Sequence, residues 1–510
     1  MKSEFSRKKS ALINLFVSFG SQILIILLNF ISRTFFLKYL SAEYLGINGL
    51  FTNILTVLSL AELGIGEAMI FAMYKPMRNN DELQLSKLLN FYRQAYRLIA
   101  VAVAVFGIIL SFFLETFVES IPDINENFQI IFLLYLANTV ASYLLTYKRS
   151  LLLADQKRYT VVIIQSTFSI IQVVLQIILL AVFKSFLLYL LVQIVCLISG
   201  NIFISLCANK KYSKVVANNK AQLSRKERKN IFNNIKALSI TRIAGVIGSG
   251  TDNLIISKMI GLTTVGLVSN YTLIVNAING LLWSILNGIV NTIGDFNVDS
   301  TVERRRSIFD QLYLGSYILF SFVGVCIVSL INPFIRIWLG EEYVLNTVLA
   351  FSLVLSIFIG GINFAAYSFR ISLGYFKQVQ WYYVAYAILN IILSIFLGKY
   401  YGAIGIFLAT SISRLITAEV ADGYYVFKCG LNRNPIKYYL RDMFSIFTFS
   451  GLCFLVTQIT SLITCGGVLG FIMQCLIAVA VTIILLLLIC FKQKGFQELF
   501  NYFIKTIKRK

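Results

Sequence analysis

Residues 468–490 read VLGFIMQCLIAVAVTIILLLLIC, an apolar run without a charged side chain that is long enough to cross a bilayer as a helix. About fourteen apolar segments of this kind fill the chain, separated by short loops. Of the 510 residues, 58% are hydrophobic and only 13% are charged, and the mean hydropathy is +0.79. We therefore expect an all-α polytopic membrane protein with about 14 transmembrane helices.

The predicted spans form two sets of seven along the sequence. The first set is Ala11–Lys38, Tyr44–Tyr74, Leu88–Val118, Asn127–Tyr147, Thr160–Phe183, Phe186–Cys207 and Ile231–Lys258. The second is Thr264–Ile293, Ile308–Ile331, Thr347–Ser368, Trp381–Gly398, Ala403–Phe427, Met443–Ile463 and Val468–Cys490. We expect an N-terminal lobe at 1–207, a basic cytoplasmic connector at 208–230, a C-terminal lobe at 231–427, two extra helices at 428–490 and a basic cytoplasmic tail at 491–510.

The formal net charge of +22 is distributed unevenly between the two sides of the predicted membrane protein. Assigning loops alternately to the two sides places about 35 of the 45 Lys and Arg residues on the side of both termini and about 5 opposite. The positive-inside rule then predicts that both termini are cytoplasmic, in a cytoplasmic membrane of the bacterial type. Because the basic residues lie in short loops between spans, we expect a lipid bilayer and no nucleic acid as partner.

The residue types that most enzymes and metal sites need are scarce. The sequence has no histidine, the commonest metal ligand and near-neutral general base. Its eight cysteines form no C-x-x-C pair, and it has no G-x-x-x-x-G-K-[ST] phosphate loop. We expect no metal, no catalytic residue and no cofactor, and thus a protein that is not an enzyme.

A weak internal repeat appears when the sequence is shifted by 220 residues. Lysine, glycine, an aromatic residue and threonine then recur in register, at Lys38, Gly46, Phe51 and Thr52 and at Lys258, Gly266, Tyr271 and Thr272. Six predicted spans separate the copies, so the two halves would share one orientation and be related by an axis along the membrane normal. The repeat predicts two six-helix lobes around a central cavity, with the last two helices as an appendage.

Three arginines inside predicted spans are candidates for binding an anionic substrate. Arg33, Arg242 and Arg414 have no obvious acidic neighbour at the same depth on their own helix. A guanidinium group suits bidentate contact with phosphate, and a desolvated cavity strengthens that contact. The alternatives are ion pairs with Asp252, Glu419 or Asp422, or, for Arg33, snorkelling to the membrane surface.

Other intramembrane charges favour structural roles. Glu62 and Glu67 descend through the second span while Arg93 and Arg97 rise through the third to similar depths, which predicts ion pairs within the first lobe. Asp252 could bind a coupling cation, or pair with Lys258 or Arg33. The residues alone leave these alternatives open.

Three passages carry a family resemblance: NFISRTFFLKYLSAEYLG at residues 29–46, AELGIG at 61–66 and RIWLGEEY at 336–343. They resemble the Wzx-type polysaccharide repeat-unit flippases of the multidrug/oligosaccharidyl-lipid/polysaccharide (MOP) exporter superfamily, and the resemblance covers essentially the whole chain. It implies a two-lobed transporter that moves a polyprenyl-diphosphate-linked oligosaccharide from the inner to the outer leaflet by alternating access. Polysaccharide polymerase machinery would be a partner. Related lipid II flippases have an arginine where Arg33 falls, but typically an acidic residue where this chain has Thr34.

Two other functions fit a polytopic chain. A cation-coupled multidrug exporter of the same superfamily would need a cavity dominated by acidic residues. A polysaccharide polymerase or ligase would need a sizeable outside loop with catalytic residues, whereas the predicted outside connections are short.

Overall fold

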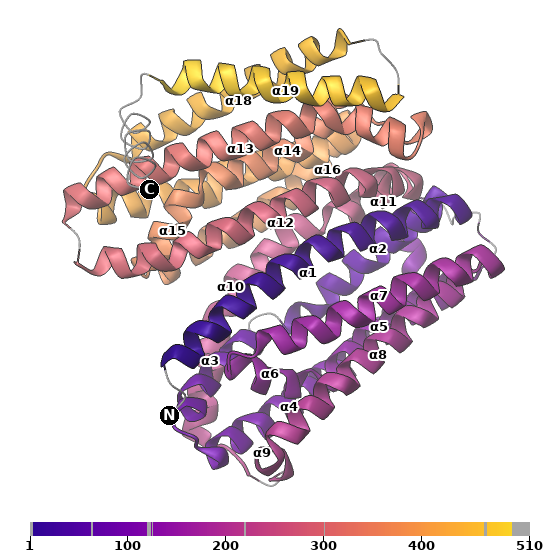
Figure 1. Cartoon of the computed structure of the whole chain (residues 1–510), viewed down its shortest axis with the longest axis vertical. Coiled ribbons are helices and arrows are strands. Elements are labelled where there is room, and N and C mark those ends of the chain that lie inside the picture. Colours follow the sequence, from indigo (N-terminus) through magenta and orange to yellow (C-terminus); the bar gives the residue numbers. More distant parts are fainter. Residues whose placement is uncertain are drawn as a thin grey trace. The chain divides into compact units, whose positions relative to one another are not determined.

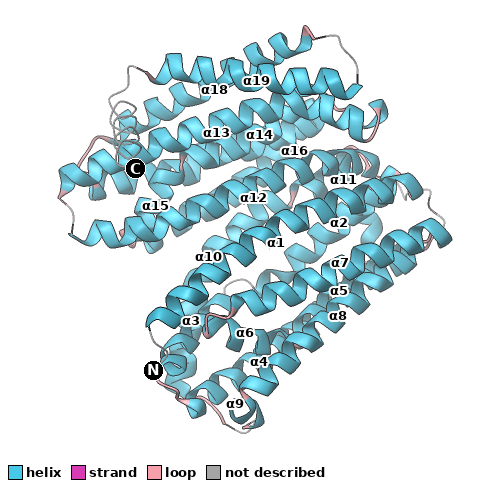
Figure 2. Ribbon diagram, in the orientation of Figure 1, coloured by secondary structure: helices cyan, strands magenta, loops and turns pink. Residues whose placement is uncertain are grey.

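The computed structural model describes residues 4–62, 65–119, 124, 126–218, 221–299, 301–463 and 467–491. Within these ranges every regular element is helical and no strand occurs (Figure 2). The expected all-α polytopic membrane architecture is thereby confirmed.

The chain forms two compact units, residues 1–266 and 267–510 (Figure 1). The first contains α1 (Glu4–Tyr39), α2 (Ala42–Leu58), η1 (Ser59–Glu62), α3 (Ile65–Arg78), α4 (Glu82–Ser111), η2 (Leu114–Phe117), α5 (Phe128–Leu144), α6 (Thr146–Ala154), α7 (Arg158–Phe183), α8 (Phe186–Lys211), α9 (Ser213–Ala217), α10 (Arg225–Gly250) and α11 (Asp252–Met259). Here α7 packs between α1 and α8, α5 lies against α4 and α8, and α10 and α11 pack on α2 and α3. The lobe boundaries predicted at 207 and 231 divide the chain differently from these units and stay a prediction.

The helix α12 (Leu262–Asp299) begins in the first unit and continues into the second. The second unit then contains α13 (Val302–Trp338), η3 (Glu341–Tyr343), α14 (Thr347–Ile362), α15 (Phe364–Ser372), α16 (Phe376–Arg414), η4 (Leu415–Glu419), α17 (Val420–Tyr424), η5 (Tyr425–Gly430), α18 (Pro435–Ser461) and α19 (Gly467–Cys490). In this unit α13 packs against α14, α18 and α19, and α14 also packs against α16.

Local sequence sets where several helices begin. The side chain of Asn434 accepts a hydrogen bond from the backbone N–H of Ile436, and Pro435 occupies the first turn of α18, where its missing N–H costs nothing. Asn127 caps α5 in the same way, accepting hydrogen bonds from the N–H groups of Gln129 and Ile130. Such caps satisfy the backbone donors that the first helical turn leaves without partners.

By length and composition, the described part of the chain holds nine membrane-crossing helices, or up to eleven if each bent pair is one span. The bent pairs are α5 with α6, at 45°, and α14 with α15, at 40°. One of the nine, Gln378–Gly430, has 53 residues and contains Gly402 with a non-helical φ of 59°. At 1.5 Å per residue it is about 80 Å long, well over twice the roughly 30 Å of one crossing, and it includes two predicted spans. The count of 14 stays a prediction.

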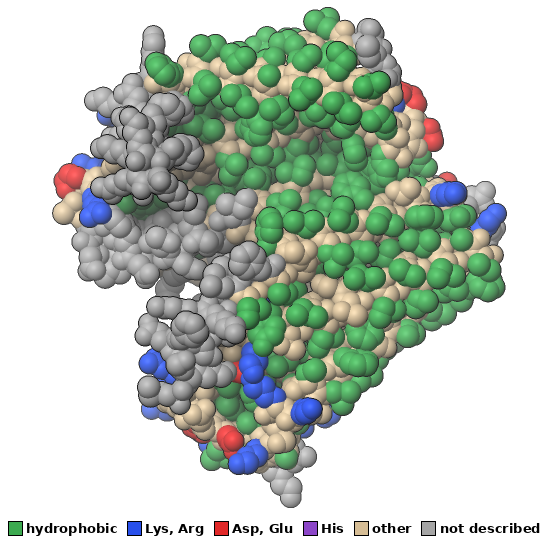
Figure 3. Space-filling model, in the orientation of Figure 1, with side chains coloured by type: hydrophobic (Ala, Val, Ile, Leu, Met, Phe, Trp, Pro, Cys, Tyr) green, Lys and Arg blue, Asp and Glu red, His purple; other side chains and the backbone are tan. Residues whose placement is uncertain are grey.

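Large apolar side chains are exposed along many of the helices, and on α19 the buried side chains are mostly small. On the face seen in Figure 3, hydrophobic side chains cover the lengths of the helices, and Lys and Arg gather near helix ends. Along α19 the buried positions are spaced by eight and then by four residues, at Gly470, Ala478, Thr482, Leu486 and Cys490. Small residues on such a stripe allow close approach to a neighbouring helix, which here is α13.

A reciprocal glycine contact joins α2 to the first turns of α12. A Cβ added to Gly46 would overlap the backbone carbonyl of Leu262, and a Cβ added to Gly266 would overlap that of Ala42. Ala42 and Leu262 are 220 residues apart, and so are Gly46 and Gly266. The internal repeat therefore has a counterpart in space, because the two copies contact each other through equivalent positions.

Candidate functional site

Arg33 lies half-buried on α1, among tyrosines from two other helices. Its electrostatic neighbours are the phenols of Tyr135 on α5 and Tyr189 on α8. The hydroxyls of Ser32 and Tyr189 are 3.4 Å apart. The helices α1, α5 and α8 thus place a guanidinium beside phenolic hydroxyls, a combination that can donate several hydrogen bonds to an anion.

Glu62 has a different partner from the predicted one. It ends η1, and its Oε1 accepts a 2.9 Å hydrogen bond from the hydroxyl of Tyr96 on α4. Tyr96 in turn accepts a 3.1 Å hydrogen bond from the hydroxyl of Tyr92. Tyr143 on α5 also lies within hydrogen-bonding reach of Glu62. Glu62 is therefore held by phenols.

The predicted partners of Glu62 point elsewhere. Arg93 lies over the ring of Tyr147, with 5.2 Å from its guanidinium carbon to the ring centroid, and its buried Nε has no hydrogen-bond partner. Arg97 is exposed. The described part of the chain shows no ion pair from Glu62 to either arginine, because residues at similar depth on two helices meet only if their helix faces also match.

The structure describes one of three further predicted residues, Asp252, and leaves the side chains of the other two undescribed. Asp252 begins α11 and is buried. Lys258, one of its possible partners, donates a 3.1 Å hydrogen bond to the carbonyl of Val118. The side chains of Arg242 and Glu67 lie outside the described residues.

Arg414 forms an ion pair with Glu419, one of the acids that the sequence offers as a partner in place of an anionic substrate. Its Nε lies 3.1 Å from Oε1 of Glu419, which is buried in the π-helical segment η4. The guanidinium also lies against Gly360 on α14, where a Cβ would be 2.7 Å from Nη1. A π-helical turn within a helix is frequent at functional sites.

A second buried ion pair was not predicted. The Nε of Arg370 on α15 lies 2.9 Å from Oδ1 of Asp422 on α17, and both side chains are at least 94% buried. Asn363 and the hydroxyl of Tyr383 each donate a 3.2 Å hydrogen bond to the other carboxylate oxygen of Asp422. Arg370 follows the predicted span Thr347–Ser368 by two residues. The sequence therefore offered two signals for this pair, an acid inside a predicted span, Asp422, and an arginine just after another span.

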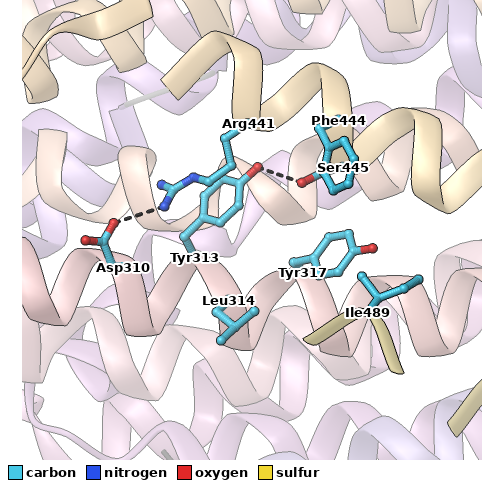
Figure 4. A pocket seen from close by; sticks show the side chains of 8 residues that line it. All are labelled: Asp310, Tyr313, Leu314, Tyr317, Arg441, Phe444, Ser445 and Ile489. Carbon is cyan, nitrogen blue, oxygen red and sulfur yellow. Dashed lines mark hydrogen bonds and ion pairs between the residues drawn. The ribbon is translucent and has the colours of Figure 1, made fainter. Parts of the chain in front are cut away.

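The second unit also contains a cavity of about 350 Å³ between α13, α18 and α19 (Figure 4). Asp310 accepts hydrogen bonds there from Arg441, at 2.9 Å, and from Arg433, at 2.7 Å. The guanidinium of Arg441 also lies over the ring of Tyr313, 3.7 Å from its centroid. Among the described residues, no three His, Cys, Asp or Glu side chains are grouped as metal ligands.

The sequence was compared with those of known protein families. The sequence pattern of the family described as polysaccharide biosynthesis protein matches residues 11–293. The chain belongs to this polysaccharide biosynthesis family. No curated protein matches its sequence.

Solved structures similar to this polysaccharide biosynthesis family member are transporters. The lipid II flippase MurJ in an inward closed conformation has 17% sequence identity and a TM-score of 0.63, with 94% of this chain and 99% of that chain covered. An inward-facing MATE multidrug resistance transporter of the MOP superfamily has 11% identity and a TM-score of 0.63, covering 86% and 99%. The eukaryotic MATE transporter AtDTX14 has 13% identity and a TM-score of 0.53, covering 86% and 99%. At these identities the likeness establishes the fold.

Proposed function

We propose that this protein is a flippase that moves polyprenyl-diphosphate-linked oligosaccharide repeat units from the inner to the outer leaflet by alternating access. The observation that carries the proposal is the pairing of two findings on one chain. The sequence belongs to the polysaccharide biosynthesis family, and the fold matches a lipid II flippase along 94% of its length. We further propose that the protein lies in a bacterial-type cytoplasmic membrane with both termini cytoplasmic, is not an enzyme, and works with polysaccharide polymerase machinery.

The charges of the first unit support an anionic substrate. Arg33 lies beside phenols, and the buried Nε atoms of Arg93 and Arg149 have no hydrogen-bond partner. Glu62, an acidic electrostatic neighbour of Arg149, accepts a hydrogen bond from Tyr96. A diphosphate would supply negative charge beside Arg33 and acceptor oxygens for the Nε atoms of Arg93 and Arg149.

Arg33, Arg242 and Arg414 remain the proposed substrate-binding residues, and Asp252 the proposed ion-coupling residue. Of the arginines, Arg33 has the surroundings best suited to phosphate. Arg414 would have to exchange its contact with Glu419 for the ligand.

The second candidate function is a multidrug exporter. It is favoured by the MATE transporter with a TM-score equal to that of the lipid II flippase. A cationic drug needs acidic contacts, so the unpartnered guanidinium nitrogens of the first unit count against it.

The two functions are separated by reconstituting the purified protein in liposomes. We expect it to speed the transfer of polyprenyl-diphosphate-linked oligosaccharide between leaflets and to leave a cationic dye untransported. Arg33→Ala should slow the transfer, whereas Lys38→Ala, an exposed cation on the same helix, should not. Dye export without lipid transfer would establish the multidrug exporter instead.

A further inference from the structure

The cavity in the second unit reaches far from the helix ends. It is lined by Tyr313 and Asp310 of α13, Arg441 and Ser445 of α18, and Ile489 of α19 (Figure 4). Tyr313 and Ser445 lie about 16 Å along their helices from the end of the unit where α13 and α18 begin. A cavity of this size can hold several water molecules, and the polar side chains of its lining, among them Asp310, Arg441 and Ser445, can hydrogen-bond to them.

Behind the cavity lies a buried carboxyl group without an ion pair. Asp442 is 3% exposed, and its Oδ1 accepts a 2.6 Å hydrogen bond from the hydroxyl of Tyr313. That hydroxyl is also 3.1 Å from Oγ of Ser445. The two nearby arginines, Arg441 and Arg433, form their ion pairs with Asp310, and the described residues place no cation at ion-pair distance from Asp442.

The hydrogen bonds on the inner side of Asp442 fit a protonated carboxyl. Asn363 donates its amide hydrogen to Asp422, so its carbonyl oxygen faces Tyr438, whose hydroxyl donates to it at 3.0 Å. Tyr438 is also within hydrogen-bonding reach of Asp442. A hydroxyl has a single proton, so a Tyr438 hydroxyl that donates to Asn363 leaves a carboxylate at Asp442 without this second phenolic donor.

The surrounding acids make a third negative charge unfavourable. Glu419 is 2% exposed, and while its Oε1 is paired with Arg414, its Oε2 is buried without a hydrogen-bond partner. Its electrostatic neighbours include Asp422 and Asp442. Two guanidinium groups, those of Arg370 and Arg414, serve the carboxyls of Asp422 and Glu419. Among the described residues Arg441 is the remaining cation near Asp442, and because its ion pair is with Asp310, a proton is the neutralising group that can bind the Asp442 carboxylate directly.

We propose that Asp442 binds a proton, which it exchanges with water in the cavity through the hydroxyls of Tyr313 and Ser445. In the forward step the carboxylate oxygen forms an O–H bond with a proton given up by a hydronium ion, which becomes water. The charged and titratable groups that face Asp442 are Tyr313 of α13, Tyr438, Tyr439 and Arg441 of α18 and Glu419 of η4. Asp310 and Asp422 lie behind them, Asp310 paired with Arg441 and Asp422 an electrostatic neighbour of Tyr438 and Glu419. The use of this proton to drive flipping rests on the proposed function.

The test is infrared spectroscopy of the full chain in lipid nanodiscs, titrated from about pH 9 to about pH 5. We expect the C=O band of a protonated, buried carboxyl in the wild type and its loss in Asp442→Asn, which keeps an acceptor for Tyr313. The control Asp310→Asn removes a carboxyl that forms ion pairs with Arg433 and Arg441, so the band should persist. A band that survives in Asp442→Asn, or the absence of any such band in the wild type, would overturn the proposal.

A second variant tests the route. Tyr313→Phe keeps the ring beneath Arg441 and removes the hydroxyl that joins Asp442 to Ser445. Hydrogen–deuterium exchange of the carboxyl band should become at least several-fold slower, and unchanged exchange would exclude this path. Because neither measurement uses a transported substrate, failure of the flippase proposal and failure of the proton site are seen separately.

Discussion

The glycine crossing of α2 and α12 yields the sharpest stability prediction. In Gly46→Ala the new methyl group would overlap the backbone carbonyl of Leu262, and in Gly266→Ala that of Ala42. Backbone atoms cannot rotate away, so the two helices must separate by roughly 1 Å or more to restore ordinary contact. Overpacking of this kind costs about 1–3 kcal/mol, and we expect each variant near the upper end because no flexible side chain yields.

The reciprocal geometry adds a second expectation. One displacement of α2 from α12 accommodates both methyl groups, so the double variant should cost clearly less than the sum of the single variants. Gly451→Ala on α18 is the matched control, because an added Cβ meets nothing within 4 Å there. Alanine should leave that helix unchanged or stabilise it by up to about 1 kcal/mol.

The assay is equilibrium unfolding of the detergent-solubilised protein in SDS, followed by tryptophan fluorescence. Gly46→Ala and Gly266→Ala should shift the midpoint down by similar amounts. If either unfolds like Gly451→Ala, the close crossing is wrong. If the two effects add fully, the shared displacement is wrong.

Three other outcomes follow from contacts in the two units. Asp422→Asn leaves the buried guanidinium of Arg370 without its counter-charge and should lower the free energy of unfolding by about 3–5 kcal/mol. Replacing both residues by apolar ones should lower it by less. Unfolding in SDS measures both effects. Ser224→Ala removes the cap of α10 and should cost about 1 kcal/mol in the same assay. Hydrogen bonds from Ser224 hold the pKa of Glu227 below its usual value, so this carboxylate stabilises the fold above its unfolded pKa, and the stability is lost as pH falls through the lowered folded pKa. Glu227→Gln should therefore flatten that part of the pH profile of unfolding.

The sequence predicted the helical membrane fold because hydrophobic length is visible without any tertiary contact. It misjudged where α18 begins. Lys437, Arg441 and Asp442 interrupt the apolar pattern, so the predicted span started at Met443, whereas the helix starts at Pro435. Only the folded structure shows that Tyr313 and Asp310 receive those polar side chains.

The sequence predicts which charged residues lie inside the spans better than it predicts which side chains they contact. Depth along a helix follows from a rise of 1.5 Å per residue, and it placed Glu62 near Arg93 and Arg97. The direction in which a side chain points changes by about 100° per residue along a helix. This direction brings the carboxylate of Glu62 to the hydroxyl of Tyr96 and not to either arginine. Arg414 pairs with Glu419, an acid five residues later that the sequence offered as one alternative among several.

The central claim, that this chain flips a lipid-linked oligosaccharide, is tested most directly in cells. The measurement is the amount of polyprenyl-diphosphate-linked oligosaccharide accessible at the outer leaflet with and without the protein. We expect loss of the protein to remove the outer-leaflet material while the same lipid accumulates inside. Unchanged accessibility would contradict the account and favour a multidrug or another lipid substrate.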